Sequence, residues 1–207
     1  MSDWTAYYAA TAAGGPRDTL LRALELWSEP PGAALDLGCG TGRDTLALLE
    51  RGWQVLATDA EDEALRELRQ RVPAALGTRL HTCQARFETL VLERHDLVNA
   101  SFSLPFCSPE HFPALWARIT AATRLGGLFC GQLLGTRDSW AGRGVTVVDP
   151  TELAELLCDW EVLHHREEEE EGHTAVGKPK HWHIHHLVLR RPARLSQPGT
   201  TLDSLGP

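Results

Sequence analysis

Apolar and polar positions along this chain alternate in a way that predicts strands separated by helices. Short apolar runs end in turn residues, and the segments between them repeat apolar positions every three to four residues, as the buried face of a helix does. Strands are expected to end at Asp36 and Asp59 and to cover about residues 79–83, 96–103 and 128–134. Strand and helix in this order predict an α/β fold, a doubly wound and mostly parallel sheet with helices on both faces.

Glycine, proline and capping residues delimit the helices. Helices are expected over residues 4–13, 16–27, 43–51, 61–72 and about 108–123. Asp149 and Glu152 predict the capped start of one more helix.

The last part of the chain predicts two strands around a polar connection. The strands are expected over residues 161–166 and 181–190, and the connection contains the acidic run 167–171, which by its charge is expected to be solvated. The Ser, Pro, Gly and Thr content of residues 192–207 predicts a disordered tail. We therefore expect a single domain over residues 1–191.

Composition narrows the classes of function. The net charge of −8 gives no general attraction to nucleic acid or to anionic membranes, so we expect no nucleic-acid partner. We expect no membrane span, because no apolar run approaches the roughly 20 residues that a bilayer requires. The N-terminus lacks the pattern of a secretory signal, and the 5 scattered cysteines favour a reduced, cytoplasmic protein. The sequence leaves the oligomeric state open.

The turn after the first strand carries the clearest chemical signal. Asp36 is followed by glycines at 38, 40 and 42 and then by a helix, and the next strand ends in Asp59. Glycines allow the backbone to approach a ligand closely, and an acid after the second strand can bind a ribose. The spacing Gly-x-Gly-x-Gly differs from that of dinucleotide sites, and no Lys or Arg lies within the turn to bind a phosphate. The acid before the turn favours a ligand with positive charge, such as a sulfonium or an ammonium.

Residues 35–59 resemble motif I of the class I S-adenosylmethionine-dependent methyltransferases. Gly42-Arg43-Asp44 and the run from Leu48 to Val55 are similar to the tellurite-resistance and thiopurine methyltransferases. The resemblance extends over about residues 16–191. It implies a sheet of seven strands in the order 3-2-1-4-5-7-6 with the last strand antiparallel, S-adenosylmethionine as cofactor, and a small-molecule methyl acceptor. It implies in-line displacement at the sulfonium methyl, for which the protein mainly supplies proximity and orientation.

The resemblance also implies where the cofactor lies. Asp59 is expected to bind the ribose. Arg86 stands where the family usually has an acid for the adenine amino group, so we expect a backbone N–H near Phe87 to meet the adenine or the Phe87 side chain to pack on its ring. We expect residues 1–15 to close over the cofactor as a lid, with Arg17 near the cofactor carboxylate. The complete set of expected cofactor-binding residues is Arg17, Asp36, Gly38, Cys39, Gly40, Asp59, Ala60, Arg86, Phe87 and Ser101.

The methyl acceptor is expected at the carboxyl edge of the sheet. Residues 135–148 form a long connection, which predicts either a binding loop or a solvated turn. The expected acceptor-binding residues are Tyr8, Phe102, Phe106, Arg137, Asp138, Trp140 and Trp182.

The histidines of the last strand allow three interpretations. His181, His183 and His185 share one face at period two. His183 could act as a catalytic base or acceptor contact, be an ordinary strand histidine, or bind a metal. We name His183 as the catalytic candidate and expect no metal, because no Cys or acid nearby in the sequence completes a site and methyl transfer requires none. The alternatives to small-molecule methyl transfer are protein or peptide methylation and a non-catalytic nucleotide-binding module.

Overall fold

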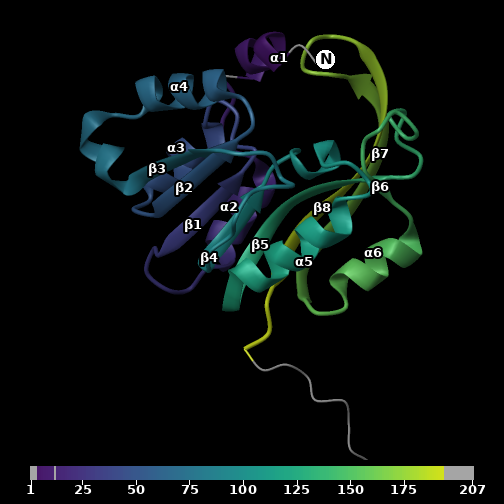
Figure 1. Cartoon of the computed structure of the whole chain (residues 1–207). Coiled ribbons are helices and arrows are strands. Elements are labelled where there is room, and N and C mark those ends of the chain that lie inside the picture. Colours follow the sequence, from purple (N-terminus) through teal and green to yellow (C-terminus); the bar gives the residue numbers. More distant parts are fainter. Residues whose placement is uncertain (1–3, 12, 194–207) are drawn as a thin grey trace, which may run out of the picture.

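A computed structural model describes residues 4–11 and 13–193 and shows an open α/β sheet with helices on both faces (Figure 1). The strands are β1 (Ala33–Leu37), β2 (Gln54–Asp59), β3 (Leu80–Gln84), β4 (His95–Ala100), β5 (Thr123–Gly135), β6 (Val147–Val148), β7 (Glu161–His173) and β8 (Pro179–Arg190). The helices are α1 (Trp4–Thr11), α2 (Asp18–Leu26), α3 (Arg43–Glu50), α4 (Asp62–Arg71), α5 (Phe112–Ala122) and α6 (Pro150–Leu157), with short 3₁₀ turns at Ala74–Arg79 and Leu104–Phe106. The predicted tail lies outside the described residues except for its first two positions.

The sheet order confirms the predicted topology. The strands run β3-β2-β1-β4-β5-β8-β7, with β8 inserted antiparallel between β5 and β7. The two-residue strand β6 pairs with β5 beside this path. Without β6, this is the order 3-2-1-4-5-7-6 that the sequence predicted. Among the described residues, no helix is long and apolar enough to cross a membrane.

Two apolar clusters fill the space on either side of the sheet. One packs α2, α3 and α4 on one face, and the other packs α5 and α6 on the opposite face (Figure 1). Strand β8 contributes to both, since Val188 packs with α2 whereas Leu187 and Leu189 pack with α5 and α6. By the same alternation, the odd-numbered side chains of β8 point toward α5 and α6 and the even-numbered ones point toward α2.

The acidic run is a strand, and the prediction of a polar connection there was wrong. Residues 167–171 lie within β7, paired with β8 from Glu161↔Arg190 to His173↔Pro179. The acids that face away from α2 meet cationic or imidazole partners, for example Glu169, which bonds to Arg137 and His181. Cross-strand polar pairs therefore replace the apolar alternation by which a strand is normally recognised. The capped start of α6 was predicted correctly, with Asp149 and Glu152 forming a reciprocal capping box.

Candidate active site

The turn between β1 and α3 forms a cradle of backbone that lines a cavity. Gly38 and Gly40 have φ values of +66° and +53°, in the left-handed region that favours glycine. A Cβ at Gly38 would lie 2.4 Å from the Cβ of Ser103, so the packing of the turn excludes a side chain there. A Cβ at Gly40 would lie 3.3 Å from the Tyr8 ring, across the cavity in front of the turn. The cradle is thus open to a ligand only because these positions lack side chains.

Asp59 connects the cradle to the end of β2. Its Oδ2 accepts a hydrogen bond from the Gly40 N–H at 2.8 Å, and its Oδ1 accepts one from the Glu61 N–H at 3.0 Å. The hydroxyl of Tyr8, from α1, donates to Oδ1 at 3.3 Å. These backbone donors hold the carboxylate in one orientation at the mouth of the cavity, as a ribose-binding acid requires.

A buried pair of carboxylates lies beneath the cradle. Asp36 accepts hydrogen bonds from the Thr45 hydroxyl at 2.5 Å and from the Asn99 amide at 2.9 Å. The same amide donates to Asp44 at 3.1 Å, and Asp44 also accepts from the Arg17 N–H at 2.8 Å. Burial and the neighbouring Asp44 raise the pKa of Asp36 to about 7. The pocket therefore contains negative charge that a cationic ligand would stabilise.

We expect the affinity for cationic cofactor analogues to rise with pH through about 7. In the ligand-free protein Asp36 is protonated below this pH, and a cation prefers its ionised form, so each unit below the pKa should weaken binding by up to about tenfold. In the absence of ligand, the raised pKa of Asp36 makes the free energy of unfolding fall as pH rises from about 4 to 7. The unfolded chain releases the Asp36 proton near pH 4, whereas the folded protein keeps it up to about pH 7. Calorimetric titration with S-adenosylmethionine, whose sulfonium is cationic, from pH 5.5 to 8 and without acceptor measures the effect. Asp36→Asn should flatten the profile, and an equally steep profile in that variant would assign the effect to another group.

The expected cofactor residues all line one cavity. It lies against the cradle, the end of β2, the segment after β3 and the end of β4. Its lining includes Arg17, Asp36, Gly38, Cys39, Gly40, Asp59, Ala60, Arg86, Phe87 and Ser101. Glu88 also lines it, so an acid is present two positions after Arg86. Their roles in binding stay predictions.

A second cavity of about 370 Å³ adjoins the first. The two share lining residues from α1, the N-cap of α2, the start of α3 and the segment after β4, namely Tyr7, Thr11, Arg17, Arg43, Phe102 and Phe106. The second cavity extends along the face of the hairpin β7–β8 that α1 approaches (Figure 1). Its size is that of small-molecule sites.

Aromatic rings form the wall of the second cavity. Ring centroids are 6.2 Å apart for Phe102 and Trp182, 5.7 Å for Trp182 and Trp140, and 5.9 Å for Trp140 and Phe106. Phe102, at φ +53°, stands where the two cavities meet, and its N–H donates to Gln132 at 2.9 Å. The expected acceptor residues Phe102, Phe106, Trp140 and Trp182 therefore come together, whereas Tyr8 lines the cofactor cavity instead.

Asp138 supports this wall from behind. Its buried carboxylate pairs with the buried ammonium of Lys180, which lies 4.0 Å and 4.2 Å from the ring centroids of Trp140 and Trp182. Asp138 also accepts the Trp140 N–H at 2.9 Å. Asp138 thus lies outside the lining of both cavities. The expected contact with the acceptor is corrected to a role in positioning the aromatic wall.

Arg137 and His183 lie on the other side of the sheet from the second cavity. Trp182 and Ile184 line the cavity, and the intervening His183 points toward the side covered by α5 and α6. Arg137 bonds to Glu169 and Glu167 there. In the part of the chain that the structure describes, neither residue reaches the cavities, so His183 as catalytic base and Arg137 as acceptor contact are corrected. The sequence indicated the edge of the sheet but not the face.

Several site residues were missed from the sequence. Asp44 and Asn99 complete the buried carboxylate site, and Glu61 and Glu88 line the cofactor cavity. Asn99 could have been noticed, because it is a polar residue near the end of an otherwise apolar strand. Glu168 and Glu170 line the second cavity from β7, a strand that was predicted to end at residue 166.

Comparison with known proteins agrees with this geometry. The model of a family described as methyltransferase domain matches residues 34–127. A carboxy-S-adenosyl-L-methionine synthase from Vibrio campbellii is 29% identical over 109 residues, which cover 50% of this chain and 44% of that protein. The chain thus matches less than half the length of this curated relative.

Solved structures share the fold at low identity. TehB from Haemophilus influenzae superposes with a TM-score of 0.73 at 19% identity, covering 87% of this chain and 64% of that one. A 1,6-didemethyltoxoflavin-N1-methyltransferase from Burkholderia thailandensis, solved with 1,6-didemethyltoxoflavin and S-adenosylhomocysteine, has a TM-score of 0.62 at 24% identity, covering 92% and 80% of the two chains.

The fold and the cradle are those expected of a domain that binds a nucleotide-like cofactor. Residues 34–127 match the methyltransferase domain family, in agreement with the resemblance of motif I to the class I S-adenosylmethionine-dependent methyltransferases. The cradle, the ribose-side acid and the buried carboxylates fit S-adenosylmethionine, the cofactor of that class.

Proposed function

We propose that this protein transfers a methyl group from S-adenosylmethionine to a small-molecule acceptor. The observation that carries the proposal is the pair of adjoining cavities, one with a glycine cradle and buried carboxylates and the other with an aromatic wall. The methyltransferase from Burkholderia thailandensis, solved with 1,6-didemethyltoxoflavin bound, supports an acceptor of this size. The net charge of −8 and the 5 free cysteines support a cytoplasmic enzyme without a nucleic-acid partner.

The protein's own residues act here by binding and orientation. Asp59 and the Gly40 backbone bind the nucleoside part, and Asp36 with Asp44 stabilises positive charge in the same cavity. When bound, S-adenosylmethionine supplies an electrophilic methyl group. Phe102 separates the cavities at the place where an acceptor must approach, and α1 covers them and limits access of water. Such positioning is the main contribution of the protein to methyl transfer. A base is needed only where the acceptor is a hydroxyl or a protonated amine.

Turnover with labelled methyl donor tests the proposal. The purified full-length protein is incubated with methyl-labelled S-adenosylmethionine and a panel of small thiols, amines and phenols, and S-adenosylhomocysteine is measured against an acceptor-free control. We expect acceptor-dependent product with at least one small molecule, and its loss in Asp59→Ala. Turnover with peptides alone would show a peptide methyltransferase, and cofactor binding without turnover on either panel would show a non-catalytic module.

Helix α1 is proposed to close over the bound cofactor. Trp4, Tyr7, Tyr8 and Thr11 line the cofactor cavity, so a ligand there fills the space beneath the helix. We expect amide hydrogen exchange of residues 4–11 to slow when S-adenosylhomocysteine is added, while exchange in α6, on the other face of the sheet, stays unchanged. Equal exchange of α1 with and without ligand would contradict a lid.

A further inference from the structure

Outside both cavities, the hairpin β7–β8 carries a ladder of histidines and acids on the face toward α5 and α6. Glu167 lies opposite His185 and Glu169 opposite His183 in the antiparallel register. His165, two positions before Glu167, lies on the same face. The acid that was not found near the histidines in the sequence is therefore supplied across the hairpin by β7.

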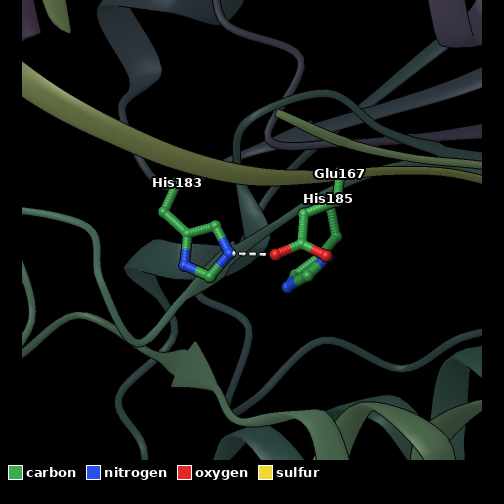
Figure 2. Close-up of side chains that lie close together, drawn as sticks. All are labelled: Glu167, His183 and His185. Atoms are coloured by element: carbon green, nitrogen blue, oxygen red, sulfur yellow. Dashed lines mark hydrogen bonds and ion pairs between the residues drawn. The ribbon is translucent and has the colours of Figure 1, made fainter. Parts of the chain in front are cut away.

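Glu167, His183 and His185 present metal-binding atoms to one another. One such atom from each residue lies within 4.8 Å of the other two (Figure 2). Glu167 Oε1 is 2.8 Å from His183 Nε2. Atoms bound to one tetrahedral Zn²⁺ are about 3.3–3.6 Å apart, given bonds of about 2.0–2.2 Å. Small side-chain rotations would bring the group to that spacing.

Burial and solvent access also suit a metal. The side chain of His183 is 4% exposed and that of Glu167 is 48% exposed, so the imidazole is held inside while the carboxylate opens to solvent. His185 is buried as well, and its ring lies beside that of His183, with ring centroids 5.1 Å apart. His165 Nε2 lies 3.2 Å from His185 Nδ1, a contact that orients the ring as outer-shell partners of metal ligands do.

Arg137 occupies the place of the cation in this structure. Its guanidinium is 2.9 Å from Glu167 Oε1 and 3.1 Å from His183 Nε2, and its backbone N–H donates to His183 Nδ1 at 3.1 Å. That last bond puts the imidazole proton on Nε2, so coordination through Nε2 requires the bond to break and the proton to move. The Arg137 side chain is 52% exposed and can turn into solvent. The Arg137 guanidinium and a metal ion therefore compete for the Glu167 carboxylate.

We propose that Glu167, His183 and His185 form a binding site for a divalent transition-metal ion of the Zn²⁺ type, which Arg137 occupies when the metal is absent. Two imidazoles and one carboxylate are a ligand set that Zn²⁺ accepts, with a position left for water. Because His183 contacts the first residues of the 136–146 loop, the metal links β7, β8 and the loop that carries Trp140. The site is separate from methyl transfer and can be tested without an acceptor.

Metal titration of tag-free, chelator-treated full-length protein tests the site. Zn²⁺ is titrated against a chromophoric chelator, and Co²⁺ is added separately to record the visible absorption of low-coordinate Co²⁺. We expect one Zn²⁺ per chain in the wild type. Affinity should fall at least tenfold in Glu167→Gln and in His185→Ala. Arg137→Ala should bind at least as tightly as the wild type, because the competing cation is removed.

His181→Ala is the matched control, since His181 lies on the same strand and face but outside the group. It should bind Zn²⁺ as the wild type does. Circular dichroism establishes folding, and if the buried His185 variant fails to fold, the exposed Glu167 variant decides. Absence of stoichiometric binding to the wild type, or unchanged affinity in Glu167→Gln, would overturn the site and leave an ion-pair network only.

Discussion

Replacing Gly40 by valine is expected to weaken binding of S-adenosylmethionine and S-adenosylhomocysteine by at least about 100-fold, or ~2.7 kcal/mol. Gly40 has φ +53°, which a β-branched residue adopts only with strain. Its added Cβ would enter the cavity at 3.3 Å from the Tyr8 ring, where the ligand and α1 must both fit. The same change displaces the Gly40 N–H that holds Asp59. Isothermal titration calorimetry measures the loss.

Gly77→Val is the matched control for this variant. A Cβ at Gly77 would meet no atom within 4 Å, and Gly77 is remote from the cradle, so binding should be unchanged. Thermal melts show whether Gly40→Val remains folded, and Gly40→Ala provides a milder step if it does not. Affinity within tenfold of the wild type in a folded Gly40→Val protein would show that the ligand does not approach this turn.

Replacing Asp59 by alanine is expected to weaken binding of the same ligands by about 1.5–3 kcal/mol, which is roughly 12- to 160-fold. The carboxylate would be lost as a charged acceptor for ribose hydroxyls. The backbone N–H groups of Gly40 and Glu61 would lose their acceptor as well, so the cradle itself should loosen. Asp59→Asn retains one acceptor oxygen and should give an intermediate loss.

Asp62→Ala provides the comparison for Asp59→Ala. Asp62 is an exposed acid three positions further along, and it pairs with Arg66 on the surface of α4. Its removal should leave ligand affinity within about twofold, since exposed pairs contribute little. If calorimetry showed the same ligand affinity for Asp59→Ala as for Asp62→Ala, the ribose would have to lie elsewhere.

The cofactor half of the site could be predicted from the sequence because its residues are close together along the chain. Asp36, the glycines and Asp59 belong to one strand-turn-helix-strand unit, and the geometry of that unit follows from local rules. Their roles in binding stay predictions, although they line one cavity. Ser101 was expected in the same cavity from the strand order, which the structure confirms, whereas Arg17 was expected there from the proposed N-terminal lid.

The acceptor half could be predicted only in part. Its aromatic residues come from the end of β4, the loop after β5 and β8, and the topology brought Phe102, Trp140 and Trp182 together as expected. The period-two alternation of strand side chains shows which residues share a face, but it could not show which face of β8 meets the cavity. Trp182 and His183 were assigned together, although neighbours on a strand point to opposite sides. The face depends on packing against α2 and α5, which involves residues far away in sequence.

The sequence by itself determined the fold class and the cofactor cradle, because strand periodicity and a glycine turn are local properties of the chain. The strand order was implied by the resemblance to the methyltransferases, and the structure confirms it. Only the tertiary structure decided that the acidic run is a strand, that His183 faces away from the cavities, and that Glu167 meets His183 across the hairpin. These outcomes depend on register and on which face of the sheet is covered. Both are set by contacts between residues distant in the chain, for which a single sequence carries no local signal.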